Sequence, residues 1–531
     1  MVIFGAAEIP ATQFRTDGDR ETRSKGMKFW AVAVALAWPA AAQVSKNLDN
    51  LYQSNGWFEF RDAMLRAPEA APFYRGELAL GFHDWPQAEK DLRTAMQSSA
   101  DPMQVVEAGI GLLRIYDLAG RRKDGRALLA KLDSVLQTHR RTGALDAASL
   151  RDFKSYRRLW NTESEYPDQS VVTRGHSRLL YSEIENQLIV PLKINGIPAN
   201  YSIDTGSDSG IISVAEARRL GLKVHRAPVD IDDELDPEMK GIGVAFADDL
   251  VIGNFHFRNI MFLVEKGDDD LSGLIGLSVL LPLETMRWSS DGSIEFGFPA
   301  QARDLAQANM CLADPTLLTR AELDGKSVLL GLDTGSFESM LFPRFSREFV
   351  DRMKTRIPLS GRAAPERIQA VALAGLRIGG LQTAFSPVPV YAKEPVEEGV
   401  DLHGWLGMDL LGQARSVSLD FVAMKLTLDG IDTAEPSLTA RAQCPLPPDF
   451  RCLPGFKCIV KAASDAPCFV ERVPVVPPPG NKVESEPEEA GNCYLPANAS
   501  CEHGMECRAV FDSNQSCHIK SEAGSARVGA P

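Results

Sequence analysis

The pattern of hydrophobic and polar positions divides the chain into a helical part and a strand-rich part. From Asn47 to about Thr162, hydrophobic residues recur every three to four positions and β-branched residues are few, which predicts α-helices. From about residue 180 to about residue 430, short apolar runs are separated by turn residues, which predicts β-strands. The order predicts a helical domain followed by an all-β region.

The helical part has the spacing of a stacked helical repeat. Ala88, Leu92 and Ala95 fall on one face of a predicted helix. The stretch from Pro72 to about residue 95 resembles one tetratricopeptide helix pair, and such pairs bury a continuous apolar face only by stacking. Three roles stay open for residues 43–170: docking of a peptide or protein partner, a helical cap packed on the following domain, and a cover over its site.

The strand-rich part is an internal repeat of one β-unit. Asn195-Gly196 and Asp324-Gly325 each lie between apolar runs, and such pairs are the strongest short signals for a tight hairpin. Further segments follow in the same order in each half. The matching segments are Ile189–Ile194 and Thr316–Leu323, Tyr201–Ile203 and Val328–Leu332, Leu250–Phe255 and Leu376–Leu381, Gly273–Gly276 and Gly404–Gly407, and Ser293–Phe296 and Lys425–Leu428. The repeat predicts two similar β-lobes, at residues 178–300 and 309–432.

The same tetrapeptide, Asp-Thr-Gly-Ser, occurs once in each half. Residues 204–207 and 333–336 carry it, and each copy begins nine residues after the start of its hairpin turn. Two carboxylates brought together by such a repeat cannot both ionise cheaply, so they share one proton. A pair of this kind can act as a base toward water and as an acid toward a leaving group. Asp204 and Asp333 are therefore the candidate catalytic residues.

The order of hairpin, Asp-Thr-Gly, short helix, glycine-bearing flap and apolar-apolar-Gly resembles the retropepsin-like and pepsin-like aspartic proteases. The resemblance covers about residues 180–430, and the stretch from Asp204 to Leu222 is similar to the bacterial retropepsin-like type. It implies that Asp204 and Asp333 hold and activate the attacking water. It also implies that Thr205 and Thr334 hydrogen-bond across a pseudo-twofold axis, with both half-sites in one chain.

The resemblance also implies supporting roles for the residues beside the two acids. Gly206 and Gly335 would let the backbone approach the carboxylates, where a side chain would clash. Ser207 and Ser336 would be donors to the carboxylates.

The apolar-apolar-Gly segments and the flap complete the implied site. The segments that end at Gly276 and Gly407 would pass beneath the two Asp loops and support them. The flap of the first lobe is expected around Gly241, Ile242 and Gly243, because glycines suit a mobile hairpin that closes over a bound strand. The chain departs from the family pattern in having no Tyr between positions 225 and 250 and no glycine-paired flap between 355 and 375.

Charge and the N-terminal sequence narrow the partners and the location. The 531-residue chain is long enough for several domains, and its formal net charge of −14 argues against nucleic acid or an anionic membrane as a partner. Met27-Lys28 opens a positive-then-apolar stretch that ends in an Ala-x-Ala signal before Gln43. This is the pattern of a signal peptide, too short for a membrane span. We therefore expect residues 1–42 to contain the leader, with translation starting at Met27. The mature chain is expected to be periplasmic or secreted, with no membrane span.

Eight of the nine Cys residues form two copies of one spacing near the C-terminus. The copies are Cys444, Cys452, Cys458 and Cys468, followed by Cys493, Cys501, Cys507 and Cys517. Four Cys in so short a stretch of an exported chain predict a small module with two disulfides, in any of three connectivities. Zinc is the competing hypothesis, but the usual C-x2-C and C-x4-C pairs are absent, so we expect no metal.

The two Cys modules are predicted at residues 443–470 and 492–520, with a Pro- and Glu-rich linker at 471–491. The ninth cysteine, Cys311, lies where the linker between the predicted lobes meets the second lobe, and it is expected to be a buried free thiol.

These features predict a multidomain chain with an all-β bilobal aspartic protease of two retropepsin-like lobes. A tetratricopeptide-like helical domain precedes it and two disulfide-rich modules follow. The predicted function is that of an exported aspartic endopeptidase that needs no cofactor and hydrolyses peptides in extended conformation, paired with strand edges in the cleft. The helical domain and the Cys modules are expected sites for a protein partner. The alternative is a non-catalytic peptide- or protein-binding module on the same fold in the cell envelope.

Overall fold

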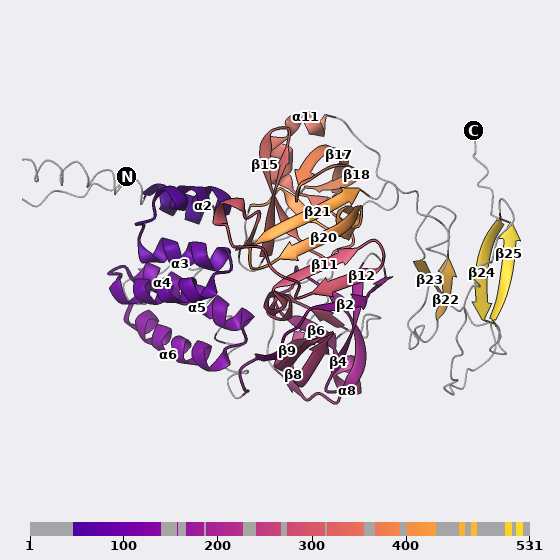
Figure 1. Cartoon of the computed structure of the whole chain (residues 1–531), viewed down its shortest axis with the longest axis horizontal. Helices are drawn as coiled ribbons and strands as arrows, with labels where there is room; N and C mark the ends of the chain where they lie inside the picture. Colours follow the sequence, from indigo (N-terminus) through magenta and orange to yellow (C-terminus); the bar gives the residue numbers. More distant parts are fainter. Residues whose placement is uncertain are drawn as a thin grey trace, which may run out of the picture.

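A computed structural model gives the arrangement of the chain (Figure 1). The described residues are 46–139, 157, 166–184, 187–226, 241–266, 273–313, 316–354, 367–392, 401–431, 456–461, 469–474, 505–511 and 517–523. The predicted leader lies outside them, and so do Cys444, Cys452, Cys468, Cys493 and Cys501. The leader and the disulfides therefore stay predictions.

The N-terminal part is helical, as the periodicity of its hydrophobic residues predicts. Its helices are α2 (Trp57–Arg66), α3 (Pro72–Gly81), α4 (Trp85–Ser98), α5 (Pro102–Leu118) and α6 (Arg122–His139). Three of them have Pro in the first turn, where the missing N–H has no helical partner to lose. Successive helices pack on one another, and Ala88, Leu92 and Ala95 are buried. The helical region is confirmed, and its tetratricopeptide-like pairing stays a prediction.

The first lobe is built on one nine-stranded sheet, in the order β1-β9-β6-β10-β5-β4-β8-β7 with β3 paired to β4. Its strands are β1 (Ser170–Thr173), β3 (Ser182–Ile184), β4 (Gln187–Ile194), β5 (Ile197–Ile203), β6 (Gly210–Ser213), β7 (Val224–Arg226), β8 (Gly241–Ile252), β9 (Phe255–Glu265) and β10 (Gly273–Ile275). Asn195 and Gly196 form the turn between β4 and β5 with φ of 49° and 78°, as a two-residue hairpin of this kind requires. Helix α8 (Val214–Arg219) follows β6.

The second lobe is built on a seven-stranded sheet, in the order β13-β14-β15-β19-β16-β18-β17. Its strands are β13 (Met310–Ala313), β14 (Thr316–Leu323), β15 (Lys326–Leu332), β16 (Met340–Leu341), β17 (Arg367–Ile378), β18 (Leu381–Tyr391) and β19 (Gly404–Leu406). Asp324 and Gly325 turn the chain between β14 and β15 with φ of 52° and 74°, so the two predicted hairpins have the same turn geometry. Short helices are α10 (Pro343–Glu348), α11 (Val350–Met353) and α12 (Met408–Leu411).

A five-stranded sheet joins the two lobes, in the order β2-β12-β11-β20-β21. Its strands are β2 (Ser177–Leu180), β11 (Thr285–Ser289), β12 (Ser293–Phe296), β20 (Ala414–Asp420) and β21 (Lys425–Ile431). The join is between β11 and β20, where Trp288 pairs with Val417 and both are buried. Three short helices lie between the lobes in sequence: α9 (Leu277–Leu280), η1 (Leu281–Leu283) and η2 (Leu305–Gln307). The predicted mostly β, two-lobed fold after a helical region is thus confirmed.

The helical region packs along one side of both lobes (Figure 1). Arg61 Nη1 donates to the carbonyl of Ala308 at 2.5 Å, and Arg303 Nη1 donates to the carbonyl of Phe82 at 2.9 Å. On the first lobe, Gln169 Nε2 donates to the carbonyl of Ser278 at 2.7 Å. Of the three roles left open by the sequence, these contacts support a helical cap on the lobes. Cys311 is a buried free thiol, as predicted, but it lies within β13 of the second lobe and not in the linker between the lobes.

The two Cys repeats each supply one hairpin to a separate four-stranded sheet, in the order β23-β22-β24-β25. The strands are β22 (Phe456–Lys461), β23 (Phe469–Pro474), β24 (Met505–Phe511) and β25 (Cys517–Ala523). The hairpins meet where Lys461 pairs with Arg508. Within the described ranges, none of the helices is both long enough and apolar enough to cross a membrane.

Candidate active site

Each half-site is a loop at the end of a buried strand. Asp204 follows β5 and Asp333 follows β15, and each strand has a parallel neighbour, β10 or β19. The N–H of Asp204 donates to the carbonyl of Ile275 at 3.0 Å, and the N–H of Asp333 donates to that of Leu406 at 3.1 Å. The two loops are therefore anchored in the same way by the strands beside them.

The two carboxylates meet between the lobes and hydrogen-bond to each other. Gly206 N donates to Asp204 Oδ1 at 2.8 Å, and Gly335 N donates to Asp333 Oδ1 at 2.8 Å. Ser336 N also donates to Asp333 Oδ1, at 3.1 Å. Each carboxylate is thus held by backbone donors of its own loop while it faces the other acid.

Burial, followed by the facing charge of Asp333, raises the pKa of Asp204 well above its usual range. Backbone donation from Gly206 and Ser207 acts in the opposite direction and is weaker. The pair therefore holds one proton between its two apparent pKa values. A pair with one proton can donate to one atom and accept from another in the same step.

Two threonines join the loops through four hydrogen bonds. Thr205 Oγ1 donates to the carbonyl of Leu332 at 2.7 Å and accepts from Thr334 N at 3.1 Å. In return, Thr334 Oγ1 donates to the carbonyl of Ile203 at 2.8 Å and accepts from Thr205 N at 3.1 Å. Both side chains are fully buried, so water does not compete for these bonds. They fix the position of one half-site relative to the other.

The glycines of the apolar-apolar-Gly segments lie against the same loops. A Cβ on Gly276 would stand 2.5 Å from the carbonyl oxygen of Ser207, and one on Gly407 would stand 2.9 Å from that of Ser336. The next residue in each segment donates its N–H to the same serine carbonyl, at 2.8 Å in both halves. Only a residue without a side chain allows this approach.

The two serines donate to the carboxylates through their backbone N–H groups, while their hydroxyls bond to the backbone of their own loops. The hydroxyl of Ser207 donates to the carbonyl of Ser209 at 2.8 Å, and that of Ser336 donates to the carbonyl of Glu338 at 3.0 Å. A serine hydroxyl readily bonds the backbone two residues away in a turn, and its single proton is then used.

The half-sites differ at the residue that follows the tetrapeptide. Gly273 pairs with Ile212 and Gly404 pairs with Leu341, so the two loops have the same length from acid to strand. Asp208 and Phe337 therefore occupy equivalent positions. The Phe337 side chain is 50% exposed beside the acid loop, so the two sides of the site present different chemistry to a ligand.

Three residues at the site were not identified from the sequence. Gln187 Nε2, on the first lobe, donates to the carbonyl of Gly335 at 2.9 Å, across 148 positions of sequence. Ser339 Oγ accepts from Gly407 N at 2.9 Å and donates to Asp409 Oδ1 at 2.6 Å. Burial raises the pKa of Asp409. None of these residues belongs to a motif, so no signal in the sequence marks them.

The predicted flap residues lie at the start of a strand. Gly241, Ile242 and Gly243 open β8, where Gly243 pairs with Arg226 of β7. The connection between these strands, residues 227–240, lies outside the described residues, as do residues 355–366 of the second lobe. A flap over the two acids stays a prediction.

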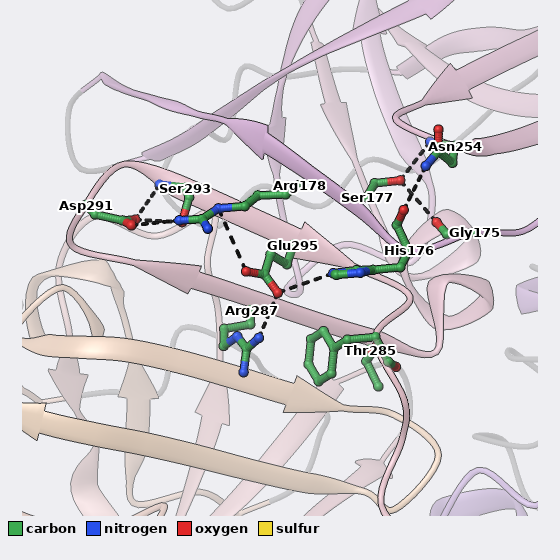
Figure 2. Close-up of polar contacts among 11 residues, drawn as sticks. Gly175, His176, Ser177, Arg178, Asn254, Thr285, Arg287, Asp291, Ser293 and Glu295 are labelled. Atoms are coloured by element: carbon green, nitrogen blue, oxygen red, sulfur yellow. Dashed lines mark hydrogen bonds and ion pairs between the residues drawn. The ribbon is translucent and has the colours of Figure 1, made fainter.

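A second polar cluster lies on the sheet that joins the lobes and shares no residue with the half-sites. Figure 2 shows the side chains of Arg287, Arg178 and His176 directed toward Glu295, and the Arg287 bond measures 2.7 Å. Arg287 and then His176 lower the pKa of Glu295 against the effect of burial. The cluster links β2 to β12 and β11 through side-chain hydrogen bonds and ion pairs. Within the described part of the chain, no three His, Cys, Asp or Glu side chains form a group suited to a metal ion.

Comparison with known proteins supports the class that the repeated motif implies. A family model described as "gag-polyprotein putative aspartyl protease" matches residues 190–281, which include the first tetrapeptide. The resemblance to the retropepsin-like aspartic proteases is thereby confirmed for this part of the first lobe. No curated protein matches the chain.

Several solved structures also match. A retropepsin-like aspartic protease from Rickettsia conorii is 22% identical, with 24% of this chain and 93% of that chain covered and a TM-score of 0.19. An aspartic proteinase from Irpex lacteus is 11% identical, with 49% and 99% covered and a TM-score of 0.30. Basic 7S globulin from soybean is 11% identical, with 48% and 95% covered and a TM-score of 0.31.

Proposed function

We propose that the chain is an exported aspartic endopeptidase with Asp204 and Asp333 as its catalytic residues. The observation that carries the proposal is a pair of carboxylates, hydrogen-bonded to each other between two equivalent loops. The family model over the first lobe supports the same class. Export rests on the leader predicted before Gln43.

The proposed chemistry uses the single proton of the pair. Ionised Asp333 takes a proton from a water molecule as the water oxygen bonds to the carbonyl carbon of the scissile peptide, and Asp204 gives its proton to the carbonyl oxygen. The tetrahedral diol then breaks its C–N bond. Asp333 gives its proton to the nitrogen, and one hydroxyl of the diol returns a proton to Asp204. The products are an acid and an amine, and the pair regains its starting state without a cofactor.

The proposed substrate is a peptide or unfolded protein segment in extended conformation. Such a chain can satisfy its backbone hydrogen bonds on the strand edges beside the two loops. The helical domain and the C-terminal hairpins remain proposed sites for a protein partner.

The test is cleavage of a denatured protein mixture by the chain from Gln43 onward, from acidic to neutral pH. We expect Asp204→Asn and Asp333→Asn each to lower kcat about a thousandfold or more, because either change leaves the pair without its exchangeable proton or its base. A statine-type inhibitor should block the wild type. The matched control is Asp351→Asn, since that side chain is 92% exposed on the second lobe and should not affect turnover.

Cleavage that persists in both dyad variants would overturn the assignment. The alternative function, a non-catalytic binding module in the cell envelope, predicts a different result. The wild type would then bind the statine-type peptide but cleave nothing, and each Asn variant would bind as tightly.

A further inference from the structure

The two half-sites share a motif but differ in the residue that stands opposite each acid. Extending the antiparallel register of β4 and β5 by two positions places Gln187 opposite Asp204. The same step in the register of β14 and β15 places Thr316 opposite Asp333. Gln187 and Thr316 are each the first residue of their strand, so the two positions are equivalent.

Gln187 reaches across to the other half-site. Its Nε2 donates to the carbonyl of Gly335 at 2.9 Å. That carbonyl belongs to the same peptide unit as the N–H of Ser336, which donates to Asp333 Oδ1 at 3.1 Å. A peptide whose carbonyl accepts a hydrogen bond is a stronger N–H donor, and the bond also fixes the plane of the peptide. Gln187 thus acts on Asp333 through one peptide unit.

The equivalent link is missing from the other half-site. The shorter side chain of Thr316 occupies the position of Gln187, and within the described residues no side chain donates to the carbonyl of Gly206. Both acids have a backbone donor from their own glycine at 2.8 Å. The hydrogen bond from Gln187 to the carbonyl of Gly335 therefore distinguishes the surroundings of two otherwise matched acids.

We propose that Gln187 is a positioning residue that decides which acid of the pair carries the proton. By orienting the peptide between Gly335 and Ser336 toward Asp333, it favours the anion there and leaves the shared proton on Asp204. The inference rests on the proposed function. The other ionisable groups on the elements around the pair include Glu183 of β3, Asp208, Glu338 and Asp409, and they are the same whichever residue stands at position 187.

The first test variant is Gln187→Thr, which places in the first lobe the residue that the second lobe already tolerates. The acidic limb of the pH profile of kcat/KM should move upward by about 0.5–1 pH unit, as expected when a carboxylate loses part of its stabilisation by backbone donors. We expect KM to change little. Gln187→Met, which keeps the length of the side chain but cannot donate, should give the same shift. The matched control is Gln369→Met, because Gln369 Nε2 donates to the carbonyl of Met353 at 3.0 Å, outside both half-sites.

A second measurement does not depend on cleavage. Carbon-13 NMR of Asp-labelled protein, assigned with the Asp204→Asn and Asp333→Asn variants, follows the two carboxyls separately. In the wild type Asp333 should ionise first, and in Gln187→Thr the two titrations should become more alike. The double variant Gln187→Thr with Thr316→Gln should restore the difference with the two acids exchanged.

The outcomes separate this inference from the proposed function. A folded Gln187→Thr variant with unchanged NMR titrations and an unchanged pH profile would overturn the positioning role. A wild type that cleaves nothing, with NMR titrations that converge in the variant, would overturn the proposed function and leave the positioning role standing.

Discussion

Gly206 of the first lobe lies directly against the carboxylate of Asp333 in the second. A Cβ added to Gly206 would stand 2.7 Å from Asp333 Cγ, and one added to Gly335 would stand 2.5 Å from Asp204 Cγ. Real Cβ atoms do not approach so closely, and neither carboxylate is free to withdraw while its own loop donates to it. The glycine of each acid loop therefore leaves the room that the carboxylate of the other lobe occupies.

The first prediction follows from this contact. Gly206→Ala should lower kcat about a hundredfold or more, because it forces Asp333 away from its partner by a sizeable fraction of an ångström. Steady-state kinetics with a peptide found in the cleavage assay measure the effect. The control is Gly56→Ala, where the nearest atom to the new Cβ would be 3.5 Å away. Wild-type turnover by Gly206→Ala would show that the pair does not need this spacing.

The second prediction concerns the threonine bridge. Thr205→Val keeps the shape of the side chain but removes one donor and one acceptor, and it leaves buried partners on the second lobe unsatisfied. The free energy of unfolding should fall by about 3 kcal/mol, measured by urea denaturation. Thr334→Val should cost as much, and the double variant should cost less than the sum because both changes break the same network.

The comparison for the threonine bridge is Thr173→Val. Thr173 is exposed, and its hydroxyl donates to the carbonyl of Asn254 at 3.2 Å, so its loss should cost little. Equal losses of unfolding free energy for Thr173→Val and Thr205→Val would contradict the conclusion that the buried bridge stabilises the protein more than an exposed hydroxyl does.

The third prediction is a pH dependence of the contact between the helical region and the lobes. His83 Nδ1 donates to the carbonyl of Phe421 at 2.7 Å, and burial lowers the pKa of His83 from 6.5 to about 4. Between these two values the unfolded chain binds a proton that the folded chain does not. Stability from this group is therefore complete above pH 6.5 and is lost as the pH falls toward about 4.

His83→Asn isolates this effect. Asn tolerates the positive φ of 57° at this position and keeps a side-chain donor, but it does not titrate. Thermal unfolding of wild type and variant should diverge between pH 6.5 and about 4, with the wild type losing more. Parallel curves over this interval would rule out His83 as the source of the acid sensitivity.

The fourth prediction concerns the unequal sides of the site. Phe337 is half exposed at the position where the other half-site has Asp208. Phe337→Asp should lower kcat/KM about tenfold for substrates whose apolar side chain lies on that side of the scissile bond, because the exposed phenyl ring that would contact it is lost. Cleavage-site profiling of a peptide library measures the preference. An identical profile in wild type and variant would show that Phe337 does not contact the substrate.

Several elements of the fold are evident in the sequence because they depend on residues close together. The hairpins at Asn195 and Asp324 follow from turn residues that accept positive φ, and the strands on either side follow from their apolar runs. The helical region follows from its periodicity. Each copy of the tetrapeptide is also a short local motif. The sequence alone therefore identifies both acid loops and shows that they are equivalent.

The chain by itself determined where the two acids stand and what surrounds them within a few positions. The tertiary structure decided how the halves meet. The bond between Gln187 and Gly335 joins residues 148 positions apart, and the Thr205–Thr334 bonds span 129 positions. The reason is physical: periodicity and turn chemistry act over a few residues, whereas a contact between two lobes depends on how whole sheets pack, and no spacing in the sequence records that packing.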